Sequence, residues 1–154
     1  MDTQFAWIES TSIAMAVASS STLTASLSAI HVIGFTLVTG GALVAHLRSL
    51  GAVLTRRPSV DVVEPANRVI LVGLAISLAT GALLFAARAT AVGTNGTFQL
   101  KMLLLISAAL FHFTVLRRVT AHPLAVPAAR AAGAIGLSLW LALAVTACAF
   151  ILLE

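Results

Sequence analysis

Long apolar stretches separated by short polar segments dominate this sequence. Each stretch has about the 20 residues that a helix needs to cross the hydrocarbon core of a bilayer, and they cover residues 23–45, 69–87, 98–116 and 131–153. A membrane-spanning strand would instead need about ten residues that alternate between apolar and polar. The pattern therefore predicts an all-α integral membrane protein, a four-helix up-down-up-down bundle.

The polar segments between these stretches set the expected helix boundaries. The first connection, residues 51–66, contains Pro65 and is typical of a solvated loop. Asn95-Gly96 in the second connection predicts a tight turn, and Pro127 suits the first turn of the last helix. We therefore expect one transmembrane domain, residues 1–154, with helices at about 23–47, 68–88, 98–118 and 128–153.

The N-terminal segment precedes the first apolar stretch and has a different character. It carries Asp2 and Glu9 and no basic residue, so it does not resemble a signal peptide. Its apolar side chains suit a short helix lying at the membrane interface over residues 3–19. A frayed tail is the alternative.

Composition supports the membrane assignment. Hydrophobic residues make up 60% of the chain and charged residues 9%, against roughly 25% charged residues in soluble domains. Tyr is absent and Ala is abundant, a bias typical of a GC-rich bacterial genome. The net charge of +4 comes from basic residues at the helix ends, so nucleic acid is not an expected partner.

The basic residues also predict an orientation. Seven arginines flank the first and third connections, whereas the second has two basic residues, Arg88 and Lys101. By the positive-inside rule, the first and third connections face the cytoplasm. Both termini and the second connection then lie on the outer side of a bacterial plasma membrane.

Small residues recur at helical spacing in the first two predicted helices. Close helix packing is sufficient to explain them; the other interpretation is room for a flat cofactor beside His31. The residues are Gly34, Gly40, Gly41, Ala42 and Ala45 in the first helix and Gly73, Ser77 and Gly81 in the second.

Histidines at membrane depth are the main candidates for chemistry, because ionisable side chains are costly there. A rise of 1.5 Å per residue puts His31 roughly 12 Å and His112 roughly 21 Å from the outer surface. His46 falls at the cytoplasmic end, and His122 in the cytoplasmic connection. These last two are better explained as interfacial residues than as ligands.

These positions are consistent with haem b, whose iron takes histidine as an axial ligand. His31 would be one ligand, and the cations of Arg88 and Lys101 would hold the haem propionates. The second ligand would be His112 or Met102. The depths of His31 and His112 differ by roughly 10 Å, and those of His46 and His112 show a similar mismatch.

Two other interpretations of the same residues stay open. The histidines could simply hydrogen-bond to Ser or Thr across helices. Copper could bind His31, Met102 and Cys148, whose side chains are soft enough, although no dense Met or Cys motif is present.

Several motifs resemble a family of uncharacterised small four-span bacterial membrane proteins. They are His31-Val-Ile-Gly34, Gly41, His46-Leu-Arg48-Ser-Leu-Gly51, Thr80-Gly81-Ala-Leu-Leu-Phe85 and Asn95-Gly-Thr-Phe98-Gln-Leu-Lys101. In that family an acidic residue is common where His46 stands, so the chain departs from it there. More distantly, the arrangement resembles small b-type cytochromes and copper-resistance membrane proteins. It also resembles small membrane protoporphyrinogen oxidases, in which a helix-one histidine and a later lysine are functional; His31 and Lys101 could match that pair.

The resulting functional hypothesis is a haem b-binding protein or redox subunit that transfers electrons at the outer side of the membrane. Its expected partners are the lipid bilayer, a quinone or a redox protein, and a second copy or a larger complex. A porphyrin-oxidising enzyme and a non-catalytic subunit or assembly factor without cofactor are the alternatives, so whether the chain is an enzyme stays open. No nucleotide-binding loop, nucleophile motif or zinc spacing is present.

Overall fold

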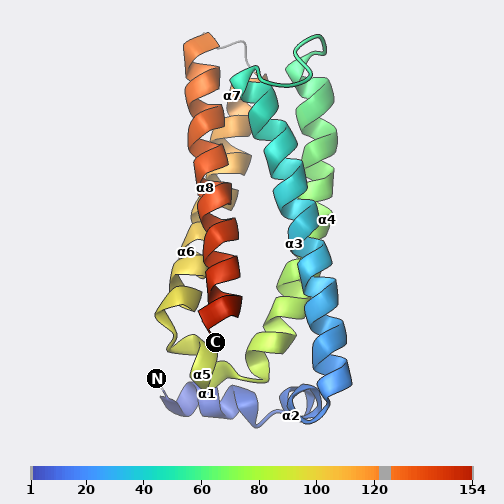
Figure 1. Ribbon diagram of the computed structural model, residues 1–154, viewed down its shortest axis with the longest axis vertical. Helices are drawn as coiled ribbons and strands as arrows, with labels where there is room; N and C mark the ends of the chain where they lie inside the picture. The colour runs from blue at the N-terminus through green and yellow to red at the C-terminus, as the bar shows by residue number, and fades with distance from the viewer. Residues whose placement is uncertain (1, 122–125, 154) are drawn as a thin grey trace.

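Four long helices form the body of the protein in the computed structural model, which describes residues 2–121 and 126–153. They run up and down beside one another (Figure 1): α3 (Ser21–Leu50), α4 (Ser59–Ala86), α6 (Gly96–Phe111) and α8 (Val126–Leu153). α6 continues through a π-helical turn, η1 (His112–Leu116), into α7 (Arg117–Ala121). Within the described ranges, four helical segments are long and apolar enough to cross a membrane. The all-α four-helix membrane bundle is therefore confirmed.

α4 begins earlier than the hydropathy pattern predicts, at Ser59. The expectation of a solvated loop up to residue 66 is therefore wrong, and Pro65 lies inside the helix. Proline lacks the N–H that would bond to the carbonyl of Asp61. Val62, Val63 and Ala66 lie on one side of these first turns of α4 and are buried. Their packing offsets the cost of the missing hydrogen bond.

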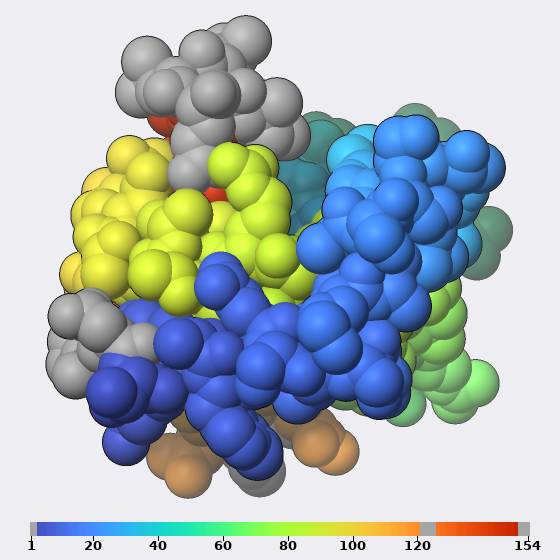
Figure 2. Space-filling model, turned by 90° about the horizontal axis from the view of Figure 1, so that it is seen from below, coloured from blue at the N-terminus to red at the C-terminus, as the bar shows by residue number. Residues whose placement is uncertain are grey.

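Two short helices precede the bundle, α1 (Asp2–Glu9) and α2 (Ser12–Ser19), where a single interfacial helix was expected. The break falls at Thr11, whose hydroxyl accepts a hydrogen bond from the Ala14 amide (3.4 Å) and so caps α2. Figure 2 shows α1 and α2 lying across one end of the bundle, beside α5 (Ala89–Gly93). We call this the α5 end, and the opposite end the arginine end.

Contacts with α5 hold α1 in place, so this segment is not a frayed tail. The Glu9 carboxylate accepts hydrogen bonds from the Thr90 amide (2.8 Å) and hydroxyl (3.0 Å). Phe5 packs edge-on against Phe85, with ring centroids 6.1 Å apart. Trp7 is exposed, as expected of an aromatic residue that meets lipid headgroups.

Asn95 ends one turn and caps α6: its amide donates to the Val92 carbonyl (3.1 Å), and α6 begins at the next residue. Its side-chain oxygen accepts hydrogen bonds from the amides of Thr97 (2.8 Å) and Phe98 (3.1 Å), the N-cap arrangement. The predicted turn is therefore present, but it ends at Asn95 instead of having Asn95-Gly96 at its centre, since Gly96 is already the first residue of α6.

Close packing of α3 on α4 uses the small residues noted in the sequence. A Cβ placed on Gly73 would lie 2.7 Å from the Gly34 carbonyl oxygen, and one placed on Gly34 would lie 2.7 Å from the Ser77 hydroxyl. The two backbones therefore touch here. Helix packing explains these glycines, and the space they leave is filled by the neighbouring helix rather than open to a cofactor.

Packing differs between the two halves of the bundle. The buried residues cluster in the middle and toward the arginine end: Val38, Ala42, Ala45, Val63, Ala66, Ile70, Ala108, Leu116, Trp140 and Leu143. On α3 the buried residues begin only at Gly34, and Ala108 is the one buried residue of α6. In the α5 half, α3 and α6 therefore contribute few buried residues, and burial there comes from α2, α4, α5 and α8, as at Val17, Thr80, Ala89 and Ala147.

Candidate functional site: two histidine clusters

His31 lies on α3 in the α5 half, with its ring against α4. Gly81 makes this position possible, because a Cβ there would lie 2.9 Å from the Cε1 atom of the imidazole. The ring is half-buried. Glycine at this point of α4 thus accommodates a histidine ring.

The hydrogen bonds of His31 determine which ring nitrogen carries the proton. Nδ1 lies 2.9 Å from the backbone carbonyl oxygen of Ser77 and 3.2 Å from the Thr80 hydroxyl oxygen. Since a carbonyl can only accept, Nδ1 carries the hydrogen and donates it. In the neutral imidazole Nε2 then presents a lone pair, the state that a metal ligand requires.

Basic residues accompany His31 toward the α5 end. Lys101 on α6 is close enough for its charge to act on the His31 ring, and its Nζ lies 5.5 Å from the centroid of the Phe150 ring. Arg88 is exposed and immediately precedes α5. Met102, the residue after Lys101, is half-buried. His31 and Lys101 thus share one region.

His112 lies in the half toward the arginine end, and its partner is His46 rather than His31. The Nδ1 of His112 is 3.2 Å from the Nε2 of His46, and the ring centroids are 5.2 Å apart. The Nε2 of His112 is 2.8 Å from the side-chain oxygen of Asn67 on α4. Both ring nitrogens of His112 are therefore engaged.

The expected depth mismatch between His46 and His112 is wrong. A depth obtained by counting residues along each helix assumes that both helices start at the same level. α3, however, begins nearer the α5 end than α6 does (Figure 1). Equal residue counts along these helices therefore do not mark equal depths. Both rings are fully buried and lie within hydrogen-bonding distance of each other, so the expectation that His46 is an interfacial residue is also wrong.

The environment of the His46–His112 pair suggests one arrangement of its protons. If Asn67 accepts from Nε2 of His112, the Nδ1 of His112 accepts from Nε2 of His46. Nδ1 of His46 then carries a lone pair, and within the described residues it has no hydrogen-bond partner. The indole N–H of Trp140, whose ring packs edge-on to His112 with centroids 6.3 Å apart, also lacks one there.

Gly136 of α8 allows His46 to occupy this position. A Cβ on Gly136 would overlap the His46 ring and lie 2.8 Å from its Nε2. The first residue of the π-helical turn, His112, completes the cluster; such turns are rare and often occur at functional sites. The cluster joins α3, α4, η1 and α8.

Sequence reasoning missed three members of this cluster. Asn67 falls just before the predicted second helix, and only the apolar spacing of Val62, Val63 and Ala66 could have extended that helix to include it. Gly136 and Trp140 lie in an apolar stretch where no local signal separates them from ordinary packing residues.

The structure does not bring together the other ligand sets that the sequence suggests. His31 and His112 belong to separate clusters, so they do not form a bis-histidine pair. Cys148 is exposed, which separates it from an interior copper site, and His122 lies outside the described residues. Within the described ranges, no group of three or more His, Cys, Asp or Glu side chains could hold a metal ion.

Comparison with known proteins supplies a family. A model described as a family of unknown function (DUF6644) matches residues 4–151. No match was found among curated proteins or among solved structures. The match covers the positions of both histidine clusters but carries no activity.

Proposed function

We propose that this chain, which belongs to the DUF6644 family of unknown function, is a haem b-binding redox subunit of a bacterial plasma membrane. The observation that carries the proposal is the arrangement of His31. Its Nδ1–H is held by the Ser77 carbonyl (2.9 Å), which leaves Nε2 as an axial ligand for iron. When one ring nitrogen of a histidine binds a metal, a hydrogen bond donated by the other nitrogen orients the ring and raises the basicity of the ligand.

The surroundings of His31 fit a large flat group with acidic substituents. Lys101, Met102 next to it and Phe150 beside the Lys101 ammonium are half-buried rather than sealed. Haem propionates are carboxylates, and Arg88 with Lys101 would hold them by charge-assisted hydrogen bonds. Met102 would serve as a second axial ligand. The His46–His112 cluster is tightly packed and is less suited to a macrocycle.

Bound haem would supply one-electron chemistry. Ser77 and Thr80 would keep the His31 ring in one orientation, and Lys101 would lower the cost of placing negative charge at this level of the membrane. By the positive-inside rule the arginine end faces the cytoplasm. Electrons would then be exchanged at the α5 end, on the outer side, with a quinone or a redox protein.

The absorption spectrum of protein purified from haem-supplied cells tests the proposal. We expect a Soret band for the native chain and its loss in His31→Ala. The control is His46→Ala, which changes a histidine of the other cluster and should keep the band. Absence of the band in the native chain would refute haem binding. Loss in His46→Ala with retention in His31→Ala would refute the assignment of His31.

Two observations favour alternatives. The closeness of Lys101 to His31 also suits a porphyrin-oxidising enzyme, which predicts turnover of protoporphyrinogen by the purified protein. The hydrogen bonds of His31, His46 and His112 also suit a non-catalytic subunit without cofactor. That alternative predicts no Soret band and co-purification with a larger membrane complex.

A further inference from the structure

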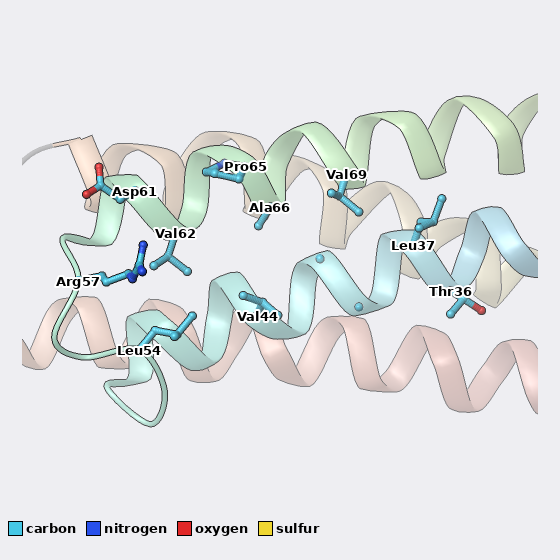
Figure 3. A pocket seen from close by; sticks show the side chains of 12 residues that line it. Thr36, Leu37, Val44, Leu54, Arg57, Asp61, Val62, Pro65, Ala66 and Val69 are labelled. Atoms are coloured by element: carbon cyan, nitrogen blue, oxygen red, sulfur yellow. The ribbon is translucent and has the colours of Figure 1, made fainter.

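A groove runs along the outer surface of the α3–α4 pair, toward the arginine end. It has a volume of about 590 Å³ and is lined mainly by apolar side chains of both helices. Figure 3 shows Leu54, Arg57 and Asp61 gathered at one end of the groove, and Thr36, Leu37 and Val69 at the other. Since α3 and α4 are long and apolar enough to span a membrane, this groove faces lipid.

Two adjacent glycines of α3 shape the groove. A Cβ on Gly40 would meet no atom within 4 Å, so the missing side chain leaves open space. A Cβ on Gly41 would lie 2.9 Å from the Ile70 side chain and 3.1 Å from the Ala66 carbonyl, so α4 approaches closely here. The result is a shallow apolar channel with a backbone floor, wide enough for a hydrocarbon chain to lie against it.

The polar end of the groove carries one positive and one negative side chain. Arg57 comes from the α3–α4 connection and Asp61 from the first turn of α4, and both are exposed. Within the described part of the chain, neither forms an ion pair with the other or with a third residue. The Arg48 guanidinium donates to the Arg57 carbonyl (2.6 Å) and holds this part of the connection in place.

The charges at this end identify the class of ligand. The groove ends where the spanning helices give way to a polar connection, the level at which headgroups lie. A purely anionic headgroup would be attracted by Arg57 and repelled by Asp61. A headgroup that carries both a phosphate and an ammonium group can satisfy both side chains by charge-assisted hydrogen bonds.

The geometry points to a binding site for a zwitterionic phospholipid. The phosphate pairs with Arg57, the ammonium pairs with Asp61, and one acyl chain lies over Gly40 and Gly41. This site is separate from the His31 region, so it stands whether or not the protein binds haem.

Native mass spectrometry of the purified full-length chain tests this site, with phosphatidylethanolamine and phosphatidylglycerol supplied in equal amounts. We expect retained adducts to be enriched in phosphatidylethanolamine. Arg57→Gln should lower its retention by about two- to five-fold, the range that one exposed ion pair contributes. The matched control is Arg56→Gln, an exposed neighbour that does not line the groove.

Two further variants separate the headgroup from the acyl chain. Asp61→Asn should remove the preference for phosphatidylethanolamine while leaving total lipid binding in place. Gly40→Leu should fill the groove and reduce retention of both lipids, whereas Ala29→Leu, which places the same side chain at an exposed α3 position outside the groove, should not. Equal retention of the two lipids by the native chain, equal effects of Arg57→Gln and Arg56→Gln, or unchanged retention in Gly40→Leu would overturn the assignment.

Discussion

Gly136→Ala provides a direct test of the His46–His112 cluster. The added methyl group would overlap the fully buried His46 ring and lie 2.8 Å from its Nε2. His46 cannot yield easily, because that nitrogen is hydrogen-bonded to His112 (3.2 Å). The substitution should therefore displace the ring and break the hydrogen bond.

The expected cost follows from three contributions. Overpacking in a filled core costs about 1–3 kcal/mol, and loss of the hydrogen bond roughly 0.5–1.5 kcal/mol. Replacing glycine by alanine in a helix returns about 1 kcal/mol. The free energy of unfolding should thus fall by about 0.5–3.5 kcal/mol.

The measurement is reversible unfolding in mixed micelles, followed by the fluorescence of buried Trp140 in a Trp7→Phe background. Gly40→Ala is the matched control, because a Cβ there meets no atom within 4 Å; it should leave stability unchanged or slightly raised. In a His46→Ala background the cost of Gly136→Ala should disappear, since the clashing ring is gone. Equal stabilities of Gly136→Ala and Gly40→Ala, or a full cost without His46, would refute the packing described.

Three further substitutions test other contacts. Gly73→Ala should destabilise the protein by about 1–3 kcal/mol in the same assay, because the new Cβ would lie 2.7 Å from backbone of α3. Asn67→Leu should lower the free energy of unfolding by about 1–3 kcal/mol, because it leaves the buried Nε2 of His112 unpaired. An unfolding curve that coincides with that of the native chain would contradict this. Glu9→Gln should weaken the bonds to Thr90 and expose α1 to limited proteolysis without lowering the stability of the bundle.

Part of the candidate site could be predicted because it depends on residue type and depth. His31 and Lys101 are polar groups within apolar stretches, which marks them without any knowledge of packing. Their partners could not be predicted in the same way. The Ser77 carbonyl that binds His31 belongs to the backbone and has no signature in the sequence, and Gly81 could equally have served helix packing.

The sequence by itself determined the membrane environment and the four spans, because hydropathy over about 20 residues is a local property of the chain. It also marked the glycines that bring α3 and α4 together, since spacing along a helix decides which residues share a face. Tertiary structure alone decided the level at which each helix starts, and hence that His46 meets His112. It also decided that Asn67 contacts His112. Relative helix offsets arise from packing between segments distant in sequence, and residue counts along single helices do not contain them.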